Sequence, residues 1–416
     1  MSLRVDSRAV TVQIGAILLF GMLVVSMSAY QASVVPAENR EAEFEHSWEV
    51  RADMLDLRGA ILRAASDGGS RPVTVELGTR YPSRTLFVNP PPSGGTLRTE
   101  GNRTAILSNA SADGETGDYW TGEPRSFPST ALTYAPSYTE YRDAPTTVYE
   151  HGTLYDRFDG GETVGSTGQT LVDGKRISLV SVDGSVSASS AEPTAVDPRG
   201  VSAPARTVTV GNRTENLTLA VRTGLSASAW EDALADQFVE AGGRVVAVRG
   251  GESGAVEIVL EPGEYDLRLA RVGVGGHADA EPRYLTDVRG DDETVRGGST
   301  ELLVVEVRDR YNTPVSGETV NLSLVDDGVS ARLEADGKVG EEIENAITDA
   351  EGRVEVTYRV DDFDGEPEPV RVRAATDRRP STDPGGVVRR ERSERRRLRP
   401  DRGRWRGRRG RPRRPR

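Results

Sequence analysis

The stretch Ile14-Gly15-Ala16-Ile17-Leu18-Leu19-Phe20-Gly21-Met22-Leu23-Val24-Val25 decides how this chain is built. It lies inside an uncharged run from Ala9 to Ala37, in a sequence of 416 residues of which 28% are charged. About 20 helical residues cross the hydrocarbon core of a bilayer, so the run is long enough to span one. Arg4 and Arg8 precede it, and the positive-inside rule then puts the N-terminus in the cytoplasm. The sequence predicts a single-pass cell-membrane protein with its C-terminal bulk outside.

The start of this run also resembles a processing signal. Arg8-Ala9-Val10-Thr11-Val12-Gln13-Ile14-Gly15, followed by a hydrophobic helix, resembles the start of haloarchaeal type IV pilins. The resemblance implies that a prepilin peptidase cuts between Ala9 and Val10 and leaves the helix in place. The alternative is a cleaved secretory signal, with Ser26-Met27-Ser28 as its small-residue cleavage site.

Beyond the membrane the helix is expected to continue as a stalk. Apolar residues fall largely at helical spacing between Glu38 and Ser66, and Asp67-Gly68-Gly69 supplies a stop signal. The apolar positions are Phe44, Trp48, Met54, Leu55, Leu57, Ile61 and Leu62. We therefore expect an anchor segment over residues 1–37 and an amphipathic stalk helix over residues 38–69. A long helix that is half in the membrane and half amphipathic is also the shape of a pilin subunit.

Residues 70–290 predict a β-rich extracellular domain with one helix. Apolar and polar residues alternate in short runs such as residues 73–77 and 217–221, with turn residues between the runs. The exception begins at Ser228, which forms a capping box with Glu231 ahead of an apolar helical pattern. Gly242-Gly243 ends that pattern.

Residues 295–376 carry the most specific pattern. Alternating residues lead from Val304 to Asp309 and into the turn Tyr311–Gly317, and Thr348–Arg353 later precedes the strand Val354–Tyr358. Both halves resemble the bacterial immunoglobulin-like group-one domain of the invasin/intimin type, with Val370–Ala374 as its closing strand. The resemblance implies a C-terminal Ig-like β-sandwich that acts as a rigid spacer in surface proteins and sometimes presents an adhesive tip. The expected fold class is thus mainly β behind an N-terminal transmembrane and amphipathic helix.

Composition favours a salt-loving organism, and the alternative is an ordinary acidic protein from a GC-rich genome. The formal net charge is −12, lysine occurs only at Lys175 and Lys338, and cysteine is absent. Dense carboxylates keep a protein soluble in strong salt. The lack of cysteine excludes disulfides and thiolate chemistry. Five sequons predict a glycoprotein, at Asn102, Asn109, Asn212, Asn216 and Asn321.

The C-terminal tail differs from everything before it. Residues 389–416 contain 16 arginines, three prolines and three glycines, which predicts disorder over residues 377–416. Two interpretations stay open. The segment is a genuine basic tail, or it is the product of a frameshift after Thr376, since GC-rich DNA encodes these residues when it is read out of frame.

The functional hypothesis is a membrane-anchored, pilin-like surface protein with a structural or adhesive role and no catalytic, cofactor-binding or metal-binding residues. Its expected partners are the membrane, a prepilin peptidase and other pilin-like or cell-envelope proteins, and no nucleic acid. The alternative is an extracellular hydrolase with an unrecognised site in the middle domain. Buried carboxylates that line a pocket there would favour the enzyme.

Overall fold

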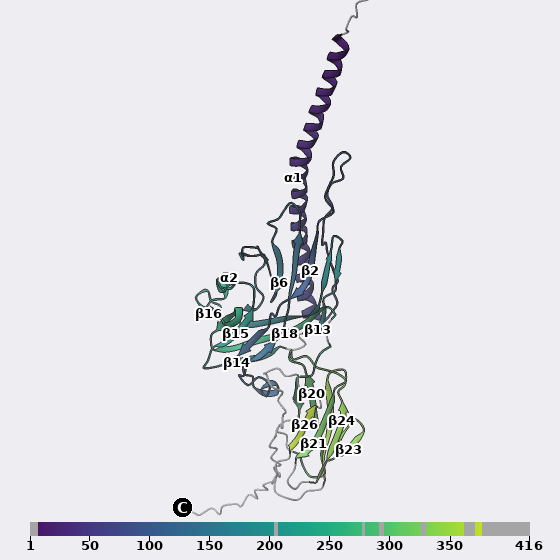
Figure 1. Cartoon of the computed structure of the whole chain (residues 1–416). Helices are drawn as coiled ribbons and strands as arrows, with labels where there is room; N and C mark the ends of the chain where they lie inside the picture. The colour runs from purple at the N-terminus through teal and green to yellow at the C-terminus, as the bar shows by residue number, and fades with distance from the viewer. Residues whose placement is uncertain are drawn as a thin grey trace, which may run out of the picture. The chain divides into compact units, whose positions relative to one another are not determined.

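The computed structural model of the chain describes residues 7–203, 207–276, 279–290, 295–325, 330–361 and 371–376. The fold is mainly β with one long N-terminal helix, which confirms the predicted fold class (Figure 1). The chain forms two compact units. The first comprises residues 1–112 and 120–279, and the second comprises residues 113–119 and 280–416. The tail expected over residues 377–416 lies outside the described residues.

Helix α1 runs unbroken from Ser7 to Asp67 and contains Pro36. At 1.5 Å per residue its 61 residues span about 90 Å. It ends at the predicted stop, where Gly68 adopts a left-handed φ of 72° and donates its N–H to the Ala64 carbonyl at 2.9 Å. Glycine adopts this conformation without the steric cost that a Cβ would add.

The C-terminal half of α1 forms one wall of the core of the first unit. Val50, Met54, Leu57 and Ile61 are at most 1% exposed, and their spacing puts them on one face of the helix. They pack in one cluster with strand residues that include Val75, Leu97, Leu132, Val182 and Val272. Three other apolar positions of the predicted stalk are exposed instead, namely Phe44, Trp48 and Leu55.

The strands described in the first unit form four sheets. A two-stranded sheet pairs β1 (Val73–Val75) with β12 (Thr194–Val196). The six-stranded sheet has the order β11 (Ser187–Ser190), β2 (Gly94–Glu100), β5 (Ala131–Ser137), β6 (Thr146–Glu150), β7 (Thr153–Arg157), β8 (Thr163–Gly165). One five-stranded sheet has the order β16 (Val245–Gly250), β17 (Ala255–Leu260), β15 (Leu217–Arg222), β3 (Ala105–Ser108), β4 (Arg125–Phe127).

The last sheet of this unit contains two neighbouring strands that run parallel to each other, the one such pair among the described strands. Its order is β13 (Arg199–Ser202), β18 (Gly263–Gly275), β10 (Arg176–Ser185), β9 (Val172–Asp173), and β14 (Val208–Asn212) also pairs with β18. Strands β10 and β18 run parallel over ten residue pairs, from Arg176 opposite Asp266 to Ser185 opposite Gly275. Strand β18 also contacts α1, which links this sheet to the helix.

The predicted helix of the middle domain is present but shorter than expected, and its capping residue is different. Helix α2 covers Ala227–Ala233, and short 3₁₀ turns follow at Ala235–Gln237 and Val239–Ala241. Ser226, and not Ser228, is the N-cap, because its hydroxyl accepts the Ala229 N–H at 3.2 Å. The Ser228 hydroxyl instead contacts that of Ser226.

The described residues of the second unit form two antiparallel sheets. The larger has the order β19 (Tyr284–Arg289), β20 (Thr300–Arg308), β25 (Arg353–Val360), β22 (Ala331–Ala335), β23 (Lys338–Gly340). The smaller has the order β24 (Glu342–Ile347), β21 (Thr319–Val325), β26 (Arg371–Thr376). Side chains of both sheets form one core, with Val307, Val320, Leu333 and Val356 fully buried or nearly so.

Candidate functional site

The N-terminal half of α1 is the clearest functional element. Val12, Ile17, Leu19, Met22 and Val25 are each between 68 and 73% exposed, although all are apolar. Among the described residues α1 is the single helix that is long and apolar enough to cross a membrane, with a mean hydropathy of 2.1 in its apolar window. This fits single-pass membrane anchoring. A signal sequence near the N-terminus would have the same length and hydropathy. The predicted cleavage residues Ala9 and Val10 lie in the first turns of this helix.

Where α1 leaves its apolar half, a buried carboxylate holds two loops against it. Glu43 is 0% exposed and accepts the backbone N–H groups of Thr139 and Glu140 at 2.8 Å and of Tyr141 at 2.6 Å. It also accepts the hydroxyl of Ser93 at 2.6 Å and that of Tyr81. Burial raises the pKa of the Glu43 carboxyl, but the hydroxyl and backbone donors outweigh it, so the net pKa lies below the ordinary value.

Three further buried carboxylates of the chain are also held by protein groups. Glu150 accepts the Thr223 hydroxyl at 2.5 Å and the Gly224 N–H at 2.8 Å, and it pairs with Arg103. Asp156 accepts the Thr147 hydroxyl at 2.9 Å and pairs with Arg51. Glu306 of the second unit pairs with Arg308 and Arg353. Each of these groups connects strands or loops that are distant in the sequence, which is a structural role.

An aromatic recess lies beside the stalk half of α1. Phe44 and Trp48 of α1, Tyr141 and Phe158 surround a volume of about 120 Å³, and the Arg51–Asp156 ion pair also lines it. Phe44 and Tyr141 meet edge to face at 5.5 Å, and the Arg51 guanidinium lies 4.8 Å from the Trp48 ring centre.

The chemistry of this recess suits a small neutral group. Trp48 is 55% exposed and Phe44 46%, so part of each ring is open to solvent. The paired charges of Arg51 and Asp156 neutralise each other, which leaves stacking on the rings and hydrogen bonds to polar lining groups as the available contacts. The partnership of Arg51 with Asp156 has no local sequence signal, because the two residues are far apart in the chain.

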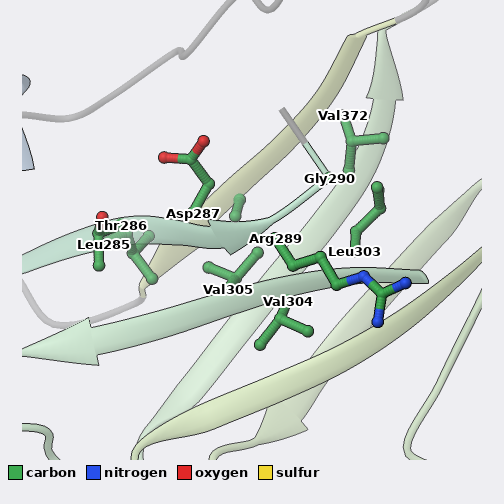
Figure 2. A pocket seen from close by; sticks show the side chains of 10 residues that line it. Leu285, Thr286, Asp287, Arg289, Gly290, Leu303, Val304, Val305 and Val372 are labelled. Carbon is green, nitrogen blue, oxygen red and sulfur yellow. The ribbon is translucent and has the colours of Figure 1, made fainter. Parts of the chain in front are cut away.

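A second recess lies within the second unit, between the edge strands β19 and β26 and the neighbouring β20 (Figure 2). Its volume is about 70 Å³, and Leu285, Leu303 and Val372 are among the apolar side chains that line it. Figure 2 shows the Asp287 carboxylate and the Arg289 guanidinium pointing in opposite directions, so the charged groups at its rim do not converge on one point.

The predicted sequon asparagines do not share one environment. Asn102 is exposed, and the side chains of Asn102 and Asn212 accept the N–H groups of Thr104 and Thr214 in local turns. The Asn109 amide nitrogen, to which a glycan would attach, instead donates to the Asn216 carbonyl at 3.1 Å. Asn321 lies in β21, where its side chain accepts the Asn345 N–H. Glycosylation of all five stays a prediction, and Asn102 is the exposed one among them.

Within the described part of the chain, no group of three or more His, Asp or Glu side chains is placed to hold a metal ion. No protein-family model matches this chain, and no solved structure matches it. A stretch of 85 residues is 28% identical to an uncharacterised protein of Archaeoglobus fulgidus. The stretch covers 20% of this chain and 15% of the archaeal protein, so it carries over neither a family nor an activity.

Proposed function

We propose that this protein is a membrane-anchored, pilin-like surface protein of an archaeal cell, with a structural or adhesive role. The observation that carries the proposal is the continuity of α1. One helix supplies both an exposed apolar segment, with Leu19 72% exposed, and the wall of a folded core, with Met54 0% exposed. A force on the extracellular unit therefore reaches the anchor through covalent helix rather than through a flexible linker.

The buried carboxylates support a structural role over the alternative of a hydrolase. General acid–base catalysis needs carboxyl groups that reach a substrate. Glu43 and Glu150 are 0% exposed, and their oxygens accept hydrogen bonds from the protein's own backbone and side chains. Such groups fix loops in place.

The second unit supports the role of an immunoglobulin-like spacer. Its two antiparallel sheets enclose one apolar core, and the expected closing strand is β26, which pairs with β21 from Val320–Thr376 to Val325–Arg371. A sandwich of this kind is stabilised by its core without cofactor or disulfide. It can hold a surface away from the cell, while the aromatic recess beside α1 offers a place for a neutral adhesive ligand such as a sugar ring.

The anchoring half of the proposal is tested by charging the exposed apolar face of α1. We expect Leu18→Arg combined with Leu19→Arg to release the protein from membranes washed at alkaline pH, because an arginine at mid-bilayer costs roughly 3 kcal/mol. Phe44→Arg is the matched control, since this residue is exposed on the same helix but outside the apolar run. Retention of the double variant in washed membranes would contradict anchoring by this segment.

A further inference from the structure

The loop between β1 and β2 lies along the upper part of α1 (Figure 1). At its base, Tyr81 and Ser93 donate their hydroxyls to Glu43. At its tip, Phe87 stacks on Tyr30 with ring centres 4.6 Å apart. The base and tip contacts on α1 are thirteen residues apart, which is about 20 Å of helix. The loop thus climbs from the folded core toward the apolar half of α1.

The tip is fixed to the helix by paired hydrogen bonds. The Gln31 side chain donates to the Val88 carbonyl at 3.0 Å and accepts the Val88 N–H at 3.2 Å. Arg84, the one charged residue between Tyr81 and Leu97, is turned back and pairs with Glu38 at 2.7 Å, where its side chain is 8% exposed. This leaves Thr85–Leu97 as an uncharged segment held in a defined position.

Two apolar side chains at this tip have no cover. Leu86 is 73% exposed and Val88 is 77% exposed, more than any apolar side chain reported for the stalk half of α1. Largely exposed leucine and valine at the end of a fixed loop are unfavourable in water, and apolar patches of this kind commonly mark a contact surface. The position of the loop tip along α1 indicates what these two side chains contact.

Counted from Arg8, the tip falls at the depth of the membrane surface. A bilayer core takes about 20 helical residues, and counting from the uncharged residue after Arg8 places its far boundary near Ser28. Tyr30 and Gln31 then occupy the first turn beyond the core, where tyrosine is enriched in membrane proteins. Because Phe87 and Val88 contact these two residues, the loop tip is at the same level.

We propose that residues 85–89 form a second membrane contact, which inserts Leu86 and Val88 into the interfacial layer of the outer leaflet. The proposal rests on the anchoring proposed above and adds a function to it. With two contacts, α1 and the loop, the bilayer fixes the tilt and rotation of the first unit, whereas a lone helix would leave both free. The occupant is the lipid surface itself, and a second copy of the chain is the competing occupant.

The absence of cysteine makes the test direct, because any introduced cysteine is unique. Full-length Val88→Cys, labelled with an environment-sensitive fluorophore, is reconstituted into phosphatidylglycerol–phosphatidylcholine vesicles in molar salt. Val246→Cys is the matched control, since Val246 is also an exposed valine of the first unit, 44% exposed on β16. Leu18→Cys reports separately on insertion of α1.

If the loop contacts lipid, the label at residue 88 shows blue-shifted emission, quenching by a lipid-borne quencher and protection from aqueous iodide, and the label at residue 246 shows none of these. The shift must persist when the vesicles hold one protein each. Loss of the shift on this dilution would assign the surface to a second copy and overturn the proposal. Iodide quenching at residue 88 equal to that at residue 246 would also overturn it, while protection at residue 18 would leave the anchor intact.

Discussion

Glu43 shows what a single buried carboxylate does in this fold. Its carboxylate accepts five hydrogen bonds from two loops. A glutamine in its place would turn an NH₂ group toward some of these donors. We expect Glu43→Gln to lower the free energy of unfolding by about 2 kcal/mol, the scale of a hydrogen bond to a charged group. Urea unfolding of the full chain in detergent, followed by tryptophan fluorescence, measures the change. Glu45→Gln, on the exposed side of the same turn, is the control and should be near neutral.

The same residue predicts a pH dependence. Its folded-state pKa is lower than the ordinary value of 4.5, so the unfolded chain takes up the proton first as the pH falls. Its contribution to stability is therefore complete above the ordinary value and is lost as the pH falls through the folded-state pKa. Glu43→Gln should flatten the acid limb of the stability curve. An acid limb unchanged by the substitution would remove Glu43 from this account.

In the second unit, Arg308 is a buried charged residue that joins segments distant in the sequence. It is 1% exposed and contacts Glu306 at 2.6 Å, Asn312 at 3.0 Å and Glu115 of the segment Asp113–Tyr119. A lysine ammonium cannot make these fixed contacts together. We expect Arg308→Lys to destabilise this unit by about 3 kcal/mol, because breaking a buried ion pair leaves a buried charge uncompensated. Arg332→Lys, with a side chain 61% exposed, should cost little in the same thermal melt, and equal losses would contradict the assignment.

These residue-level networks could not be predicted from the sequence. Glu43 and its donor Tyr141 are 98 positions apart, and Arg308 and Glu115 are 193 apart. No local pattern marks such a pair, because only the folded backbone brings the partners together. The predicted N-cap of α2, Ser228, was wrong by two residues. Two serines compete for this capping position, and the earlier one, Ser226, forms the cap.

At the scale of elements, hydrophobic periodicity predicted well where a single face is buried. Alternation predicted the strands that became β20 and β25, and the stop signal Asp67-Gly68-Gly69 marked the end of α1. Periodicity could not distinguish the buried positions of α1 from Phe44 and Trp48, since the apolar residues near residue 50 occupy more than one face of the helix. Tertiary packing, which brings the sheets against only one face, makes that choice.

The two faces of α1 give a prediction with an internal control. Met54 is 0% exposed in the core of the first unit, while its neighbour Leu55 is 39% exposed. We expect Met54→Ala to cost about 3 kcal/mol, since truncation leaves a cavity that the surrounding sheets cannot fill. Leu55→Ala should cost less than about 1 kcal/mol. Similar losses for the two variants in urea unfolding would mean that the helix faces are assigned wrongly.

At the scale of the whole molecule, the sequence predicted the class of architecture but not the boundaries of its units. The expected middle domain ends at residue 290, yet β19 (Tyr284–Arg289) pairs with β20, and residues 113–119 cluster with the second unit. The stacked rings of Tyr119 and Tyr284, 4.2 Å apart, belong to this cluster. A segment donated from so far upstream leaves no trace in composition or periodicity.

The residue at which the mature chain begins tests the central claim most directly. Protein extracted from washed membranes is sequenced from its N-terminus, in parallel with any protein found in the medium. Anchoring through a pilin-like α1 predicts a membrane-bound chain that starts at Val10. A start at Met1 or Ser2 would reject the processing and leave the anchor. A soluble chain that starts near Ala29 would contradict the claim, because the exposed apolar half of α1 would then be a discarded signal.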